Sequence, residues 1–253
     1  MTRILSVIPA RAGSKGIVGK NFKEFAGKPL VEWSVWQSLS CLYAGSWESD
    51  YADAETVART VVSSNCPYVK EVVDSIPHSH QVVYIPRPES LCEDLSPSEE
   101  ALIHSYEWMR DHEGYDADVI IMLQPTSPIR RPSLLKECVE TFRREKERFG
   151  CDSLVSVQKI TPFFMRKEPN GDSYIPQGSM IIERPMRQSV MDFQFFYHDC
   201  GNVYITDIDI LIETNNRVGK KPTMFVVSDE EALQIDTELD FRIAEEIMRK
   251  GYS

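Results

Sequence analysis

The chain has 253 residues, of which 42% are hydrophobic and 26% are charged; these proportions are typical of a globular protein and exclude a disordered, collagen-like or disulfide-dense chain. Its 28 basic and 39 acidic residues give a net charge of −11, which argues against a general binder of nucleic acids or anionic membranes, because those partners require a positive surface. We therefore expect any phosphate-binding surface to be local.

Neither a membrane span nor a secretory signal is evident. The longest uninterrupted apolar run is Val119–Leu123, far below the roughly 18 residues that cross a bilayer. The short apolar stretch after Arg3 is interrupted by Ser6 and Pro9, unlike a signal peptide. The six cysteines contain no C-x-x-C spacing, which predicts reduced thiols rather than a zinc site. We expect a cytoplasmic protein.

Short apolar runs alternate with helical patterns over the first 150 residues, which predicts an α/β fold with a mostly parallel sheet. Residues 41–58 resist assignment, and we expect a surface insertion or an extra helix there. The expected strands and helices, in chain order, are a strand at Ile4–Ile8, a helix from Pro29 to Leu39, a strand at Thr60–Ser63, a helix at Val69–Val73, a strand at Gln81–Ile85, a helix at Ser98–Arg110, a strand at Asp118–Leu123 and a helix at Leu134–Arg148.

The pattern changes after Ser153, where β-like runs flank a stretch punctuated by proline and glycine. We expect a small β-rich arm at 160–197 inserted in a single domain, 1–253. The remaining expected elements are β-like runs at Leu154–Gln158 and Phe193–Tyr197, a strand at Asn202–Ile205, a helix at Asp209–Glu213, a strand at Thr223–Val227 and a helix at Glu238–Arg249.

A loop rich in glycine and cations follows the first expected strand, where open α/β sheets bind ligands. Its glycines permit close approach of the backbone to a ligand, although it matches neither G-x-G-x-x-G nor the P-loop pattern. Residues 1–23 contain five basic residues, among them Arg11, Lys15 and Lys20, and no Asp or Glu. This local charge predicts a polyphosphate site; the alternative is a solvated basic loop whose glycines only form turns.

These residues resemble the opening signature of the acidic-sugar cytidylyltransferases, a family that includes CMP-sialic acid synthetases and their legionaminic, pseudaminic and Kdo relatives. Similar segments follow in the same order over about 230 residues. The matching residues are Arg11, Ser14, Lys15, Gly16, Lys20 and Asn21 of R-x-x-S-K-G-x-x-x-K-N, then L-Q-P-T-S-P-I-R at 123–130, Arg187-Gln188, Gly201 with Tyr204, and I-D-T-E-L-D at 235–240.

The resemblance implies a Rossmann-like nucleotidyltransferase in a three-layer sandwich, with the arm serving dimerisation. It implies a homodimer that uses Mg²⁺ and transfers CMP from CTP to an acidic nine-carbon sugar. Arg11 and Lys15 would hold the β- and γ-phosphates, Lys20 the α-phosphate and Asn21 the nucleoside. The implied nucleotide-binding set also contains Gly13, Ser14, Arg87, Ser96 and Ser98, and the implied catalytic residues are Arg11, Lys20 and Asp236.

Two polar segments are candidates for sugar binding. Gln124, Thr126 and Ser127 follow an apolar strand and offer the neutral donors and acceptors that a sugar requires; the alternative is a proline-rich turn. Arg187 could grip a carboxylate through its planar guanidinium while Gln188 orients it; the alternative is an exposed interface loop. Tyr204 completes the expected substrate-binding set.

Asp236 is the expected Mg²⁺ ligand, because a carboxylate can hold a cation that bridges phosphate oxygens. The alternative is a helix cap formed by Asp236 or Thr237, since Thr237-x-x-Asp240 resembles a capping box. Gln234 stands where the family usually has a second Asp, and an amide binds Mg²⁺ less well. Two further hypotheses thus remain: a nucleotidyltransferase for another sugar or sugar phosphate, and a nucleotide-binding homologue with impaired turnover.

Overall fold

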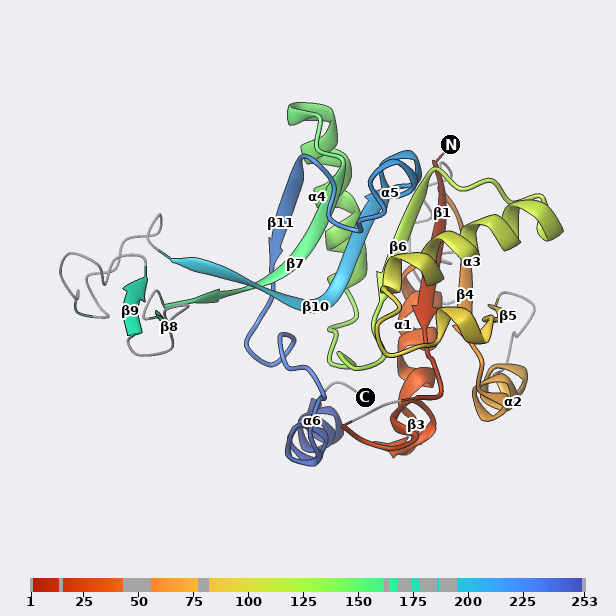
Figure 1. The fold of residues 1–253 in the computed structure, drawn as a ribbon, viewed down its shortest axis with the longest axis horizontal. Helices are drawn as coiled ribbons and strands as arrows, with labels where there is room; N and C mark the ends of the chain where they lie inside the picture. Colours follow the sequence, from red (N-terminus) through yellow and green to blue (C-terminus); the bar gives the residue numbers. More distant parts are fainter. Residues whose placement is uncertain are drawn as a thin grey trace.

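The computed structural model describes residues 2–13, 16–42, 56–76, 82–161, 164–167, 174–177, 186 and 195–251. Its centre is a seven-stranded sheet with the order β11-β7-β10-β6-β1-β4-β5 (Figure 1). The strands are β1 (Thr2–Pro9), β4 (Thr56–Ser64), β5 (Val82–Pro86), β6 (Val119–Leu123), β7 (Ser153–Ile160), β10 (Phe196–Asp207) and β11 (Pro222–Val226).

All neighbouring strands of this sheet are parallel except β10, which runs antiparallel to both β6 and β7. This arrangement confirms the predicted α/β class with a mostly parallel sheet. Because side chains alternate along β1, Ile4 and Ile8 face one apolar cluster while Leu5 and Val7 face another on the opposite side of the sheet.

Helices cover both faces of the sheet and so form three layers (Figure 1). One face packs against α1 (Leu30–Leu42), α2 (Pro67–Ser75) and α4 (Leu134–Phe149). The other packs against α3 (Ser98–Glu113) and α5 (Ile208–Thr214).

The last helix, α6 (Glu238–Gly251), packs against residues near the N-terminus and so brings the two ends of the chain together. Phe241 of α6 packs edge-on against Phe25, with ring centroids 5.3 Å apart, in a third apolar cluster that also contains Ile17 and Ile235. Short elements near this cluster are η1 (Lys20–Phe22), β2 (Glu24–Phe25) and β3 (Lys28–Pro29), and η3 (Glu89–Leu91) follows β5. The N-terminal loop is thereby anchored beside α6.

The structure differs from the predicted elements mainly in β10. The separate runs expected at Phe193–Tyr197 and Asn202–Ile205 belong in part to one continuous strand, Phe196–Asp207. Its pairing with β7 shifts register between Asp199 and Tyr204, and Gly201 there has a φ of +65°. A β-bulge of this kind admits a glycine into a strand without ending it.

The arm contains the hairpin of β8 (Phe164–Lys167) and β9 (Tyr174–Gln177), which lies beyond the outer ends of β7 and β10 (Figure 1). Within the described ranges, no helix is both long enough and apolar enough to cross a membrane.

Candidate active site

A pocket of about 370 Å³ opens at the edge of the sheet where β1 and β6 end. Pro9, the last residue of β1, and Met122 of β6 belong to its lining. This is the edge at which open α/β sheets bind ligands. Ten of the residues predicted from the sequence to form the site line the pocket: Arg11, Gly13, Lys20, Asn21, Arg87, Ser96, Ser98, Gln124, Thr126 and Asp236.

The N-terminal loop meets the segment before α6 at Gly16. A Cβ atom on Gly16 would collide with the backbone carbonyl oxygen of Asp236, so the approach requires glycine. The Lys20 ammonium donates to the carbonyl oxygen of Ile235 and lies 3.8 Å from a carboxylate oxygen of Asp236. Residues from the two ends of the chain thereby form one wall of the pocket.

Lys20 is a buried cation beside a solvent-facing carboxylate. Its side chain is 9% exposed, whereas that of Asp236 is 74% exposed. Burial lowers the pKa of Lys20, because the ammonium loses hydration, while the charges of Asp236 and Asp240 oppose that shift. An entering phosphate would restore the stabilisation that burial removes from the ammonium.

Arg11 connects this wall to the loop after η3. Its guanidinium donates to the carbonyl oxygens of Cys92 and Glu93 at 3.0 and 2.7 Å and forms an ion pair with Asp94 at 3.4 Å. The Asn21 amide donates to the Arg11 carbonyl oxygen at 2.8 Å. Asn21 therefore holds the backbone of Arg11, and the loop after η3 holds its guanidinium.

A third group of predicted residues comes from the segment between β5 and α3. Arg87 is buried and donates to the hydroxyl and the carbonyl oxygen of Ser63 at 3.1 and 2.7 Å; burial lowers its pKa. Ser98 begins α3, and the Ser96 hydroxyl donates to the Ser90 carbonyl oxygen at 3.2 Å. A cation and a helix amino end on one wall favour a bound anion.

Gln124 and Thr126 add neutral side chains to the pocket lining, and backbone contacts fix their positions. The Thr126 carbonyl oxygen accepts a hydrogen bond from the Ile235 N–H at 2.8 Å. The Gln124 carbonyl oxygen accepts one from Arg130 at 2.9 Å, and Arg130 also donates to the Asn202 carbonyl oxygen at 2.8 Å. Burial lowers the pKa of Arg130 to about 9. Arg130 belongs to a segment that resembles the family, but the sequence alone assigns it no role.

Two predicted substrate contacts do not lie in the pocket lining. The Ser127 side chain is fully buried. Tyr204 points toward the cluster beneath α3 and α5, and its hydroxyl donates to the Asp199 carboxylate at 2.7 Å. Both side chains are directed into the fold rather than toward the lining. Ser14, Lys15, Arg187 and Gln188 lie outside the described residues.

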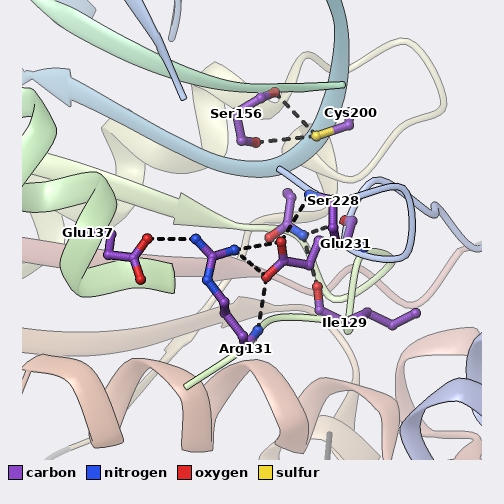
Figure 2. Close-up of polar contacts among 8 residues, drawn as sticks. Ile129, Arg131, Glu137, Ser156, Cys200, Ser228 and Glu231 are labelled. Carbon is purple, nitrogen blue, oxygen red and sulfur yellow. Dashed lines mark hydrogen bonds and ion pairs between the residues drawn. The ribbon is translucent and has the colours of Figure 1, made fainter. Parts of the chain in front are cut away.

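A buried carboxylate outside the pocket lining, that of Glu231, is not marked by the sequence. Glu231 is 1% exposed and accepts hydrogen bonds from the Arg131 guanidinium at 2.6 and 2.8 Å and from the Ser228 N–H at 3.1 Å (Figure 2). Arg131 also donates to Glu137 of α4 at 2.6 Å. This network ties the loop after β6 to the segment that leads to Asp236. No sequence motif marks it.

The residues present fit one mode of Mg²⁺ binding. Within the described part of the chain, no group of three or more His, Cys, Asp or Glu side chains could hold a metal. Asp240 accepts the N–H groups of Asp236 and Thr237 and, with the Thr237 hydroxyl, forms the capping box of α6. The Asp236 carboxylate is not used in that cap. A single carboxylate suits a Mg²⁺ ion that is held mainly by substrate phosphates.

Known proteins resemble this chain over nearly its whole length. The N-acylneuraminate cytidylyltransferase of Escherichia coli O18:K1:H7 is 26% identical over 98% of this chain and 53% of its own length. The CMP-N,N'-diacetyllegionaminic acid synthase of Legionella pneumophila is 28% identical over 97% of this chain and 96% of its own. The N-acylneuraminate cytidylyltransferase A of Danio rerio is 30% identical, and the chain covers 52% of it. The chain thus spans about half the length of the Escherichia coli and Danio rerio relatives and nearly all of the Legionella pneumophila relative.

Solved structures share the fold. A CMP:2-keto-3-deoxy-manno-octonic acid synthetase complexed with CTP matches with a TM-score of 0.60 at 17% identity over 98% of both chains. A 4-diphosphocytidyl-2C-methyl-D-erythritol synthase matches with a TM-score of 0.64 at 12% identity, over 98% of this chain and 99% of its own. The sequence pattern of the family described as Cytidylyltransferase matches residues 5–168. The chain therefore belongs to the cytidylyltransferase family.

Proposed function

We propose that this protein transfers CMP from CTP to the anomeric hydroxyl of an acidic nine-carbon sugar of the sialic, legionaminic or pseudaminic acid type, with release of pyrophosphate. The observation that carries the proposal is a single pocket whose lining holds Lys20, 3.8 Å from Asp236, together with the neutral side chains of Gln124 and Thr126. Such a pocket offers charge to a triphosphate and neutral hydrogen-bonding groups to a sugar. The N-acylneuraminate and legionaminic acid relatives named above support this substrate class and not the alternative of another sugar.

In the proposed reaction the sugar hydroxyl oxygen forms a bond to the α-phosphorus of CTP. The bond from that phosphorus to the bridging oxygen breaks, pyrophosphate leaves with the bonding electrons, and the hydroxyl proton is released. The protein contributes mainly by positioning the reactants and neutralising charge. Lys20 would face the α-phosphate, whereas Arg11 would hold the outer phosphates.

We propose that Asp236 holds Mg²⁺ together with the triphosphate. The ion, when bound, would neutralise charge on the phosphate oxygens. The protein's own part is to keep the Asp236 carboxylate directed to solvent and outside the α6 cap. We propose that Arg187 and Gln188 contact the sugar.

We also propose a cytoplasmic homodimer. The described cysteines Cys66, Cys92, Cys138, Cys151 and Cys200 form no disulfide, which suits a reducing compartment. Exposed apolar side chains on β8 and at the outer end of β10 support a dimer through the arm.

The test is pyrophosphate release from CTP with N-acetylneuraminic acid, N,N'-diacetyllegionaminic acid and pseudaminic acid as acceptors. We expect release with at least one of them, dependent on Mg²⁺, and much slower release when UTP, GTP or ATP replaces CTP. Absence of release with all three sugars would reject the proposed function. Tight CTP binding without any release would instead favour the nucleotide-binding homologue.

A further inference from the structure

Two side-chain amides come together at Gly201 in β10. A Cβ atom on Gly201 would collide with Nε2 of Gln234 and with Oε1 of Gln124. These two atoms therefore border the same small space, although one residue follows β6 and the other precedes α6. Nε2 is a hydrogen-bond donor and Oε1 is an acceptor, so atoms of complementary type border this space.

The backbone of β10 is shaped to admit both amides. Gly201 has a φ of +65°, which disfavours any residue with a side chain. The Asp199 carboxylate accepts the Gly201 N–H at 3.0 Å and the Tyr204 hydroxyl at 2.7 Å. These two hydrogen bonds fix the backbone of the bulge, which borders the space that the two amides occupy.

Of the two glutamines, only Gln124 is among the residues that line the pocket. Its backbone carbonyl oxygen accepts a hydrogen bond from Arg130 at 2.9 Å, which fixes the backbone from which the side chain extends. Because Oε1 is directed toward Gly201, the NH₂ group of the planar amide is directed away from Gly201.

We infer that Gln234 is a positioning residue that orients the Gln124 amide, so that the pocket offers a hydrogen-bond donor rather than a carbonyl oxygen to the acceptor sugar. The donor would recognise an oxygen of the sugar, such as a carboxylate, carbonyl or hydroxyl oxygen. This inference rests on the proposed function. It also separates the role of Gln234 from that of Asp236, whose carboxylate lies beside Lys20.

The test uses Gln234→Glu, which keeps the shape of the side chain but puts an oxygen where the donor was. That oxygen would repel Oε1 of Gln124 and turn the amide over. With the sugar that the unchanged protein turns over, we expect the KM for the sugar to rise about tenfold, the effect of one misplaced hydrogen bond. The KM for CTP and the Mg²⁺ concentration for half-maximal rate should not change.

A binding measurement separates recognition from turnover. The dissociation constant of the sugar, measured with a non-hydrolysable CTP analogue already bound, should rise by the same factor as the KM. Gln234→Leu removes the donor without introducing an oxygen and should cause a smaller rise. Gln158→Glu is the matched control, because the Gln158 amide donates to Asp229 at 3.0 Å outside the pocket; it should leave both substrate KM values unchanged.

Each remaining outcome is decisive. An unchanged sugar KM in Gln234→Glu, or equal effects of Gln234→Glu and Gln234→Leu, overturns the inference while the proposed function stands. A higher kcat or lower Mg²⁺ requirement in Gln234→Asp also overturns it, because the residue would then act at the metal. If the unchanged protein uses none of the three sugars, the proposed function fails and the inference fails with it.

Discussion

At the scale of single residues, Lys20 is the group on which catalysis most depends in this account. It is a buried ammonium, bonded to the Ile235 carbonyl oxygen and directed at the pocket. We expect Lys20→Met to slow pyrophosphate release at least about 100-fold, because one preorganised charge at a transition state contributes on that order. Lys28→Met is the control, since Lys28 is 42% exposed and pairs with Glu32; its rate should match that of the unchanged protein.

The pH dependence of Lys20 provides a second test. Burial holds its pKa below the ordinary value of 10.5. The unfolded chain therefore retains this proton to higher pH than the folded protein, so raising the pH through the window below 10.5 increases this residue's contribution to stability. Activity should fall in that same window, because the ammonium is lost. A catalytic rate and a free energy of unfolding that both rise, or both fall, in this window would contradict the lowered pKa of a catalytic Lys20.

Gly16 tests the contact between the two ends of the chain. In Gly16→Ala the new methyl group would meet the Asp236 carbonyl oxygen, and we expect a loss of about 1–3 kcal/mol in the free energy of unfolding, as for other overpacked sites. Denaturant unfolding measures it. In Gly13→Ala the methyl group meets nothing within 4 Å, so its free energy of unfolding should change by less than about 0.5 kcal/mol. Equal losses would show that the Gly16 contact is not tight.

At the scale of elements, Glu231 holds the loop after β6 against the segment before α6 (Figure 2). We expect Glu231→Gln to lower the free energy of unfolding by about 3 kcal/mol, because Arg131 loses a partner whose side chain is 1% exposed. Glu137 also pairs with Arg131 but is 40% exposed, so Glu137→Gln should cost less than about 1 kcal/mol. Equal losses in the free energy of unfolding, measured in urea, would contradict the difference in burial between Glu231 and Glu137.

The elements also show what sequence patterns could predict. Strand β6 is predictable because a strand buried on both faces is a continuous apolar run. Helix α4 is predictable because a helix buried on one face repeats its apolar residues with a period of 3.6. The continuity of β10 was missed, because a bulge at Gly201 looks in sequence like the end of a strand. Arg130 and Glu231 were missed for another reason: their partners are backbone atoms or side chains far away in the chain. The pocket's cations were predictable because the N-terminal loop carries them close together.

At the scale of the whole molecule, the arm predicts self-association. Met165 and Phe196 are 54% and 42% exposed, and Phe164 packs edge-on against Phe196 with ring centroids 5.4 Å apart. Sedimentation equilibrium should give twice the chain mass of 29.0 kDa, since burying such side chains against a second copy removes apolar surface from water.

The paired variant Met165→Ser/Phe196→Ser should shift that mass toward the monomer. Phe149→Ser is the control, because Phe149 is 64% exposed at the end of α4, away from the arm. A monomer mass for the unchanged protein, or no shift in the paired variant, would contradict the proposed dimer.

The proposed nucleotide site depends on a local reversal of charge. A chain with a net charge of −11 places Arg11, Lys20 and Arg87 around one pocket with Asp236 at its wall. The most direct test is a crystal structure with CTP and Mg²⁺ bound. We predict the triphosphate beside Lys20 and Arg11, with Mg²⁺ between its oxygens and the Asp236 carboxylate. CTP bound elsewhere, or a triphosphate that contacts neither cation, would contradict the account.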